Sequence, residues 1–126
     1  MIQQQTILKV IDNSGAKTVK CIKVLGGFKK KYSFLGEVII VSVKNLRNKS
    51  KVTSKVKKGE VWRALIVRTK KRVLNKDGSI FFFKQNCVSL INKQGQPVAT
   101  RILGPVPKKI KKSKFSKFAS LSTGLV

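Results

Sequence analysis

The chain has 126 residues, of which 29 are Lys or Arg and 4 are Asp or Glu, and it contains no His, so its formal net charge is +25 at pH 7. Its hydrophobic content of 41% is enough for one modest core, which excludes a disordered basic tail. The absence of His excludes a Ser-His or Cys-His nucleophile and a His-bearing zinc site. Because so high a charge destabilises a compact monomer by self-repulsion, the composition favours a polyphosphate partner.

Short stretches rich in Val, Ile and Phe predict β-strands, and turn sequences separate them. The predicted strands cover residues 6–11, 18–25, 38–43, 61–69, 79–83 and 87–91. Asp77-Gly78 predicts a hairpin, since a type I′ turn needs positive φ at both central residues. The apolar runs 38–41 and 64–67 suit strands buried on both faces, inside a closed barrel or under a cover. We therefore expect a mainly β protein built on a small barrel with long basic loops.

The chain is expected to form a single domain, with the barrel over roughly residues 1–106 and a basic helical segment over roughly 107–126. Phe115, Phe118 and Leu121 recur every three residues, as along one edge of a short helix. We expect them to pack on the barrel, with base stacking as the alternative. Phe81 and Phe83 share one face of a predicted strand, and at least one face of that strand should be core.

Most of the cations lie in predicted connections and in the C-terminal segment, and the stretch 44–58 holds a dense cluster without an acid. A solvated surface would explain one such cluster, but not four with almost no compensating acid. The cations are mostly Lys, which suits contact with backbone phosphates, and we expect the long 44–58 segment to order against RNA. The expected phosphate-binding residues are Lys29, Lys30, Lys31, Lys44, Arg47, Lys49, Lys51, Lys55, Lys57, Lys58, Arg68, Lys70, Lys71, Arg72, Lys108, Lys109, Lys111 and Lys112.

Catalytic and metal-binding patterns are lacking in the sequence. Cys21 and Cys87 stand alone in apolar stretches, so we expect buried free thiols in a reducing compartment. Each of the 4 carboxylates adjoins a turn, which predicts a structural role. There is no Gly-rich phosphate-binding motif. We expect a protein that is not an enzyme and that needs no cofactor or metal.

Targeting patterns are lacking as well. Residues 1–6 show neither the basic and apolar pattern of a signal peptide nor the Arg- and Ser-rich pattern of a transit peptide. No apolar run approaches the ~20 residues of a membrane helix. We expect no presequence and no membrane segment.

A series of short motifs runs in order along essentially the whole chain. The motifs are Met1-Ile2-Gln3-Gln4-Gln5-Thr6, Asp12-Asn13-Ser14-Gly15-Ala16, Cys21-Ile22-Lys23-Val24-Leu25-Gly26-Gly27, Val56-Lys57-Lys58-Gly59-Glu60-Val61, Val67-Arg68-Thr69-Lys70-Lys71, Asp77-Gly78-Ser79 and Thr100-Arg101-Ile102-Leu103-Gly104-Pro105-Val106. Each motif is weak alone, but the ordered series resembles the large-subunit ribosomal protein L-fourteen family of bacterial type.

The resemblance implies a five-stranded β-barrel with a short C-terminal helical region. It implies a structural protein of the large ribosomal subunit that binds large-subunit rRNA and helps bridge to small-subunit rRNA. The implied neighbours are ribosomal proteins L-three and L-nineteen, and in bacteria and organelles the exposed face docks a ribosomal silencing factor. The residues that fall on this intersubunit and silencing-factor face are Thr100, Arg101, Lys114, Lys117 and Ser120.

The chain departs from the family pattern at a few places. Ala99 stands where the family has Gly, and Ser89 stands where the family prefers Val. The 44–58 segment is longer and more basic than in the family, and the chain end lacks an acidic residue that is common there. With a composition rich in Lys, Phe, Ile and Asn, these departures favour a fast-evolving organellar genome. We expect an organelle-encoded protein of the mitochondrial ribosome, with a bacterial ribosome in the cytoplasm as the alternative.

Two other functions remain open from the residues. One is a free single-strand-binding barrel of the OB type that stacks bases on Phe81, Phe82 and Phe115. The other is a regulatory protein that binds a partner through Thr100, Arg101 and Ser120, which is compatible with a ribosomal role. For the ribosomal function, charge reversal at Arg68 and Lys70 is expected to weaken subunit incorporation more than reversal at Lys93, which lies in a predicted exposed turn.

Overall fold

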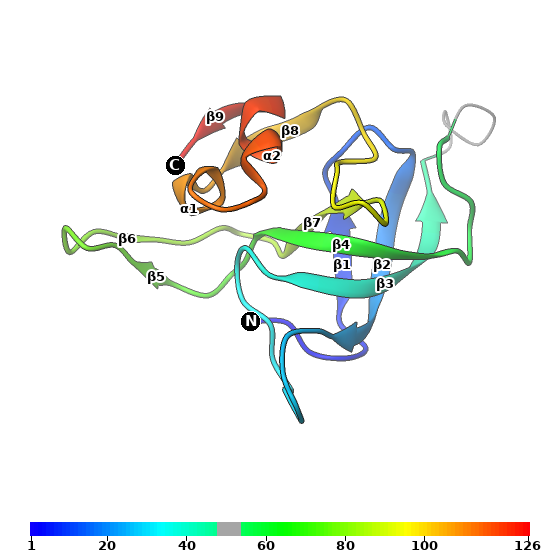
Figure 1. The fold of residues 1–126 in the computed structure, drawn as a ribbon, viewed down its shortest axis with the longest axis horizontal. Helices are drawn as coiled ribbons and strands as arrows, with labels where there is room; N and C mark the ends of the chain where they lie inside the picture. Colours follow the sequence, from blue (N-terminus) through cyan, green and yellow to red (C-terminus); the bar gives the residue numbers. More distant parts are fainter. Residues whose placement is uncertain (48–53) are drawn as a thin grey trace.

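The computed structural model describes residues 1–47 and 54–126. Its centre is a closed five-stranded barrel, which confirms the expected fold, and its strand order is β1-β2-β3-β4-β7 (Figure 1). Neighbouring strands are antiparallel except β1 and β7, whose parallel pairing closes the barrel. The barrel strands are β1 (Ile7–Val10), β2 (Ala16–Val24), β3 (Val38–Leu46), β4 (Val61–Arg68) and β7 (Cys87–Ile91).

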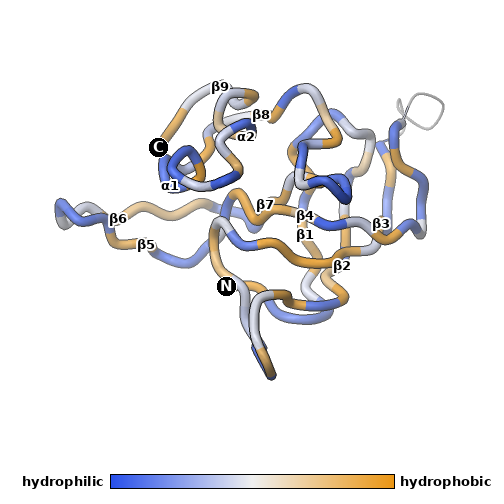
Figure 2. Tube along the Cα trace, in the orientation of Figure 1, coloured by the Kyte–Doolittle hydropathy of each residue, from blue (hydrophilic) through white to orange (hydrophobic). Residues whose placement is uncertain are grey.

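Two apolar clusters account for the burial of these strands. One fills the barrel, where Ala64 and Ile66 of β4 meet Val88 and Leu90 of β7. The other lies outside the barrel and contains the alternate residues of the same strands, including Leu65. Both faces of β4 are therefore buried from Ala64 to Val67, which is why this run of four apolar residues does not alternate with polar ones (Figure 2).

The cover is the C-terminal segment, which forms β8 (Ile102–Val106), α1 (Lys108–Lys111), α2 (Ser116–Leu121) and β9 (Ser122–Leu125). β8 and β9 pair in parallel as a separate two-stranded sheet, which the sequence did not predict. Phe115 and Phe118 are buried against the second cluster with their rings 5.9 Å apart, edge to face. The expected packing of these aromatics on the barrel is confirmed, which removes Phe115 as an open platform for base stacking.

A hairpin of β5 (Val73–Leu74) and β6 (Ile80–Phe81) projects from the end of β4 (Figure 1). The hairpin at Asp77-Gly78 was predicted, but only Gly78 has positive φ, so the turn is not type I′. The prediction that residues 79–83 have a core face is wrong. Phe82 is 58% exposed, and Phe81 and Phe83 are half-buried against each other, because the hairpin extends beyond the second layer of the fold.

No helix in residues 1–47 or 54–126 is long and apolar enough to cross a membrane.

Gly104 lies where β8 approaches the end of β4. Its φ is +81°, and a Cβ built there would collide with the Arg68 guanidinium. That guanidinium donates hydrogen bonds to the carbonyls of Pro105 and Leu103, so it is not free to move aside. We expect Gly104→Ala to lower the free energy of unfolding by about 2–3 kcal/mol, from strain and overpacking together.

Gly95 is the matched control for this prediction, because it has a φ of +82° and open space where a Cβ would be placed. Gly95→Ala should cost only the backbone strain, about 1 kcal/mol. Urea unfolding of both variants separates backbone strain from overpacking. Equal losses of unfolding free energy would show that the Arg68 side chain moves aside without an energetic cost.

Candidate nucleic-acid interface

Lysines line the outer side of the barrel where β1 pairs with β2. Lys9 is exposed between the buried residues Leu8 and Val10, and it lies opposite Thr18 in the β1–β2 register. Lys17 is exposed next to the buried Ala16. The period of two in β1 directs Lys9 outward, and in β2 the register shifts between Ala16 and Val19 leave Lys17 outside while both apolar residues are buried.

Two surface hollows share Lys9 and Lys17. One is completed by Val10, Leu46 and Arg47, and the other by residues that include Lys70, Gln85 and Asn86. Neither hollow has a carboxylate among its described lining residues. We call Lys9, Lys17, Arg47 and Lys70 the basic barrel face.

The basic barrel face joins cations that are far apart in the sequence. Arg47 follows β3 and Lys70 follows β4, and the expected phosphate contacts at these two positions are brought to one surface. Lys9 and Lys17 were missed by the sequence reasoning, which looked for charge in connections. The signal that could have found Lys9 was the alternation of Lys with apolar residues in 8–10, whereas Lys17 lies in Ala16-Lys17-Thr18-Val19, which does not alternate.

The 44–58 segment is only partly a loop. Lys44 lies in β3, contrary to its expected place in a connection, because pairing with β2 continues to Leu46. Lys49 and Lys51 lie outside the described residues. Lys55 is held by the barrel, since its backbone N–H donates to Ser14 and its Nζ donates to the Val98 carbonyl at 3.2 Å. The end of the segment is thus fixed by the protein itself, with the predicted phosphate ligands Lys57 and Lys58 exposed beside it.

Arg68 has a structural task in addition to its charge. Its Nε donates to the Pro105 carbonyl at 3.0 Å and its Nη2 donates to Leu103, which ties β8 to the barrel. Charge reversal at Arg68 would therefore damage the fold as well as any RNA contact. Lys70 has no such role through its side chain, so it is the better partner for a comparison with Lys93, which lies in an exposed turn as predicted.

Two further expected phosphate ligands lie over aromatic rings. The Lys71 Nζ is 4.4 Å from the centroid of the Phe34 ring, and the Arg72 Cζ is 5.8 Å from that of Phe82. Both side chains are exposed, so the cations remain accessible to an anion.

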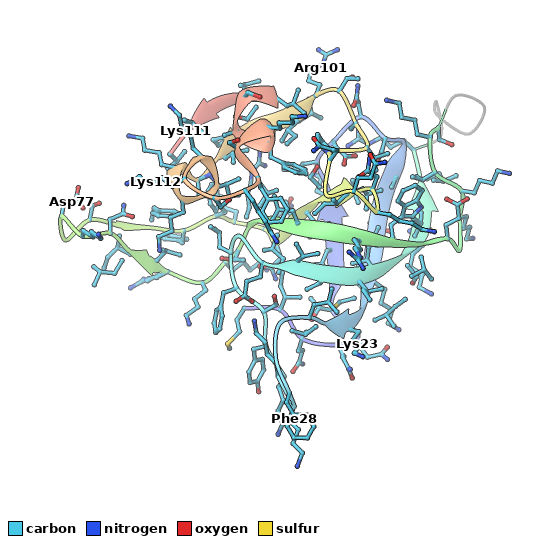
Figure 3. The ribbon with its side chains drawn as sticks, viewed as in Figure 1. Lys23, Phe28, Asp77, Arg101, Lys111 and Lys112 are labelled. Atoms are coloured by element: carbon cyan, nitrogen blue, oxygen red, sulfur yellow. The ribbon has the colours of Figure 1, made fainter. Side chains whose placement is uncertain are left out.

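The third group of expected ligands, Lys29, Lys30 and Lys31, lies in the projecting loop of residues 25–37 between β2 and β3 (Figure 3). Lys30 forms an ion pair with Glu37 at 2.8 Å. Ser33 and the Phe34 N–H also donate to the Glu37 carboxylate. Burial alone would raise the pKa of Glu37, but the hydrogen bonds from Lys30, Phe34 and Ser33 outweigh it and lower the pKa below its ordinary value of 4.5.

Glu37→Gln should lower the free energy of unfolding by about 1 kcal/mol at pH 7. Because the folded-state pKa is lowered, the carboxylate stabilises the fold above the ordinary pKa, and this contribution is lost as pH falls through the lower folded value. Urea unfolding of both proteins should therefore give a difference at pH 7 that shrinks towards pH 3. An equal difference at both pH values would contradict the assignment.

The last expected group, Lys108, Lys109, Lys111 and Lys112, surrounds the short helix α1. All four side chains are exposed, while Ile110 is buried in the second apolar cluster. Lys111 and Lys112 point outward above the β5–β6 hairpin, whose tip carries Asp77 (Figure 3). The structure therefore places this group beside the hairpin, apart from the hollows of the basic barrel face.

The residues expected on the intersubunit and silencing-factor face divide into two places. Thr100 is held by Asn13, whose side chain accepts from the Thr100 N–H and donates to its hydroxyl. The β8–β9 register sets Ile102 opposite Ser122, so Arg101 lies close to the end of α2, and Lys117 and Ser120 line a common hollow. Lys114 lines a different hollow with Arg63 and Lys93.

The two cysteines are buried free thiols, as predicted, and burial raises the pKa of both. Within the described part of the chain, no group of three or more His, Cys, Asp or Glu side chains is placed to hold a metal ion. The surface chemistry is that of ammonium and guanidinium groups around an apolar barrel. Residues 1–126, the whole chain, match the model of the family described as Ribosomal protein L14p/L23e.

Proposed function

We propose that this chain, which belongs to the ribosomal protein L14p/L23e family, binds large-subunit rRNA through the basic barrel face. As a member of that family, the chain is a structural constituent of the large ribosomal subunit rather than an enzyme. The observation that carries this proposal is the meeting of Lys9, Lys17, Arg47 and Lys70 around two adjoining hollows. Cations spaced along one shallow surface match the repeating charge of an RNA backbone.

The chemistry of the face favours recognition of shape and backbone. Three of its four cations are Lys, which binds phosphate as a point charge rather than reading bases with a planar fork. Arg47 has part of its donor capacity occupied, since its Nη2 donates to the Val10 carbonyl at 3.2 Å. The other expected ligands on the 25–37 loop, the hairpin and α1 would extend this surface along neighbouring RNA.

We propose two further contacts for the edge formed by Thr100, Arg101, Lys117 and Ser120. This edge would contribute to a bridge with small-subunit rRNA, and a ribosomal silencing factor would dock on it. Support comes from Asn13, which orients the Thr100 backbone and leaves the Arg101 side chain exposed. Lys114 would act from its separate hollow. Ribosomal proteins L-three and L-nineteen are the proposed neighbours in the subunit.

The ribosome that contains this protein is proposed to be mitochondrial. The composition rich in Lys, Phe, Ile and Asn and the net charge of +25 support an organellar genome. A bacterial ribosome is the alternative.

Sedimentation of a tagged copy tests both the rRNA binding and the compartment. We expect the protein to stay with large subunits at low salt and at roughly half-molar salt, where non-specific phosphate contacts are largely lost. The ribosome recovered identifies the compartment. Release into the light fractions at high salt would contradict an integral role and favour loose electrostatic association.

A further inference from the structure

Phe28 stands at the tip of the 25–37 loop and is 93% exposed (Figure 3). It forms a hydrophobic point at the end of a largely polar projection (Figure 2). Phe is among the residues most often buried in folded proteins, and this ring points away from both apolar clusters. A side chain in this position has no role in the packing of the chain itself.

The loop is held at its base. Ser33 and Ile2 exchange two backbone hydrogen bonds, of 2.9 and 2.7 Å. The Glu37 carboxylate gathers donors from Lys30, Ser33 and Phe34. Phe28 is therefore presented by an ordered support, which lowers the entropy cost of binding through it.

The Phe28 ring has a cation beside it. The Lys29 Nζ lies 5.5 Å from the Phe28 centroid, and the Lys31 side chain is exposed close by along the chain. Lys30 is already paired with Glu37, so Lys29 and Lys31 carry the local charge. An exposed apolar ring with one ammonium group beside it and a second exposed lysine three residues along the chain matches a nucleotide, which has a base to stack and phosphates on either side.

We propose that Phe28 is a base-stacking site for one unpaired nucleotide of RNA, with Lys29 and Lys31 on the flanking phosphates. This inference rests on the proposed rRNA binding and adds a contact of a different kind, which is insensitive to salt. An apolar pocket on a neighbouring protein is the competing occupant. The flanking lysines favour RNA, because a protein pocket that received this tip would have to accommodate two cations as well.

Equilibrium binding to a transcript of large-subunit rRNA from the same genome provides the test, measured between roughly 0.1 and 0.4 M salt. Phe28→Leu keeps an apolar side chain but removes the ring, and we expect about 10-fold weaker binding with an unchanged salt slope. Phe28→Trp should bind within about twofold of the parent. Its fluorescence should be quenched by the transcript beyond any change seen in the parent, which has Trp62 alone.

Val61→Ala is the matched control, since Val61 is an exposed apolar residue on β4, and it should leave binding unchanged. Parent-like binding by Phe28→Leu would overturn the stacking site. If Lys9→Glu, Lys17→Glu and Lys70→Glu together still weaken binding in that case, the rRNA function stands without it. Failure of the parent protein to bind the transcript would overturn both proposals.

Discussion

Charge reversal at Lys9, Lys17 and Lys70 together is expected to lower the affinity for large-subunit rRNA by at least about 100-fold at roughly 0.1 M salt. Each lysine that neutralises a phosphate releases condensed counterions, and this gain is lost when the ammonium is replaced by a carboxylate. The three side chains line adjoining hollows without a neighbouring acid among the described lining residues, so no local pairing offsets their loss.

The salt dependence of binding gives the sharper readout. Loss of three phosphate contacts should reduce the slope of log affinity against log salt by about 2 to 3, since each contact contributes about 0.7–0.9. The fold should be unaffected, because Lys9 and Lys17 point away from the core and the Lys70 side chain is exposed. Circular dichroism of the variant provides that check.

The matched control reverses the charge of three exposed lysines on other parts of the fold. They are Lys23 on β2, Lys76 at the hairpin tip and Lys93 in the turn after β7. The change in net charge is the same, but these three lysines do not share a surface hollow. We expect a loss of affinity well below that of the first variant. Equal losses would show that total charge, rather than the basic barrel face, determines binding.

Asp12→Ala is expected to lower the free energy of unfolding by about 3–4 kcal/mol. The Asp12 carboxylate is fully buried. One oxygen accepts from the backbone and side chain of Ser14, and the other accepts from the Leu90 N–H and the Ser89 hydroxyl. Its removal leaves several buried donors unpaired between the β1–β2 turn and β7, and a cavity where the side chain was.

Ser89→Val is the matched control, because it removes one donor and leaves the acceptor with its remaining partners. We expect a loss of about 1 kcal/mol, and urea unfolding measures both variants. Similar losses would mean that the hydroxyl is as important as the carboxylate. This contact also gives a structural reason for Ser89, which supplies a donor to Asp12.

The barrel strands could be predicted because their signals are local. Stretches rich in apolar residues at 6–11, 18–25, 38–43, 61–69 and 87–91 can be recognised from neighbouring residues alone, and β-branched side chains favour extended backbone in each. Residues 79–83 carry the same signal. Their placement in a projecting hairpin depends instead on whether a second layer lies opposite, which a single strand does not reveal.

The candidate site was predicted in part. The clusters of Lys in the connections were visible in the sequence, as was the absence of compensating acids. Lys9 and Lys17 were missed, and Phe28 was not singled out, because the importance of each depends on its neighbours in space. The stacking residues considered from the sequence illustrate the same limit: Phe82 is exposed, Phe115 is buried, and the more exposed Phe28 was not considered.

The sequence by itself determined that this protein is a small, mainly β, strongly cationic ribosomal protein, because composition, strand periodicity and ordered motifs are properties of the chain. The tertiary structure decided which cations lie together. Closure of the barrel brings Arg47 and Lys70 to the strand face that carries Lys9 and Lys17, while Arg68 is turned inward to hold β8. The physical reason is that the free energy of a phosphate contact depends on distances between side chains, and only the packing of strands fixes those distances.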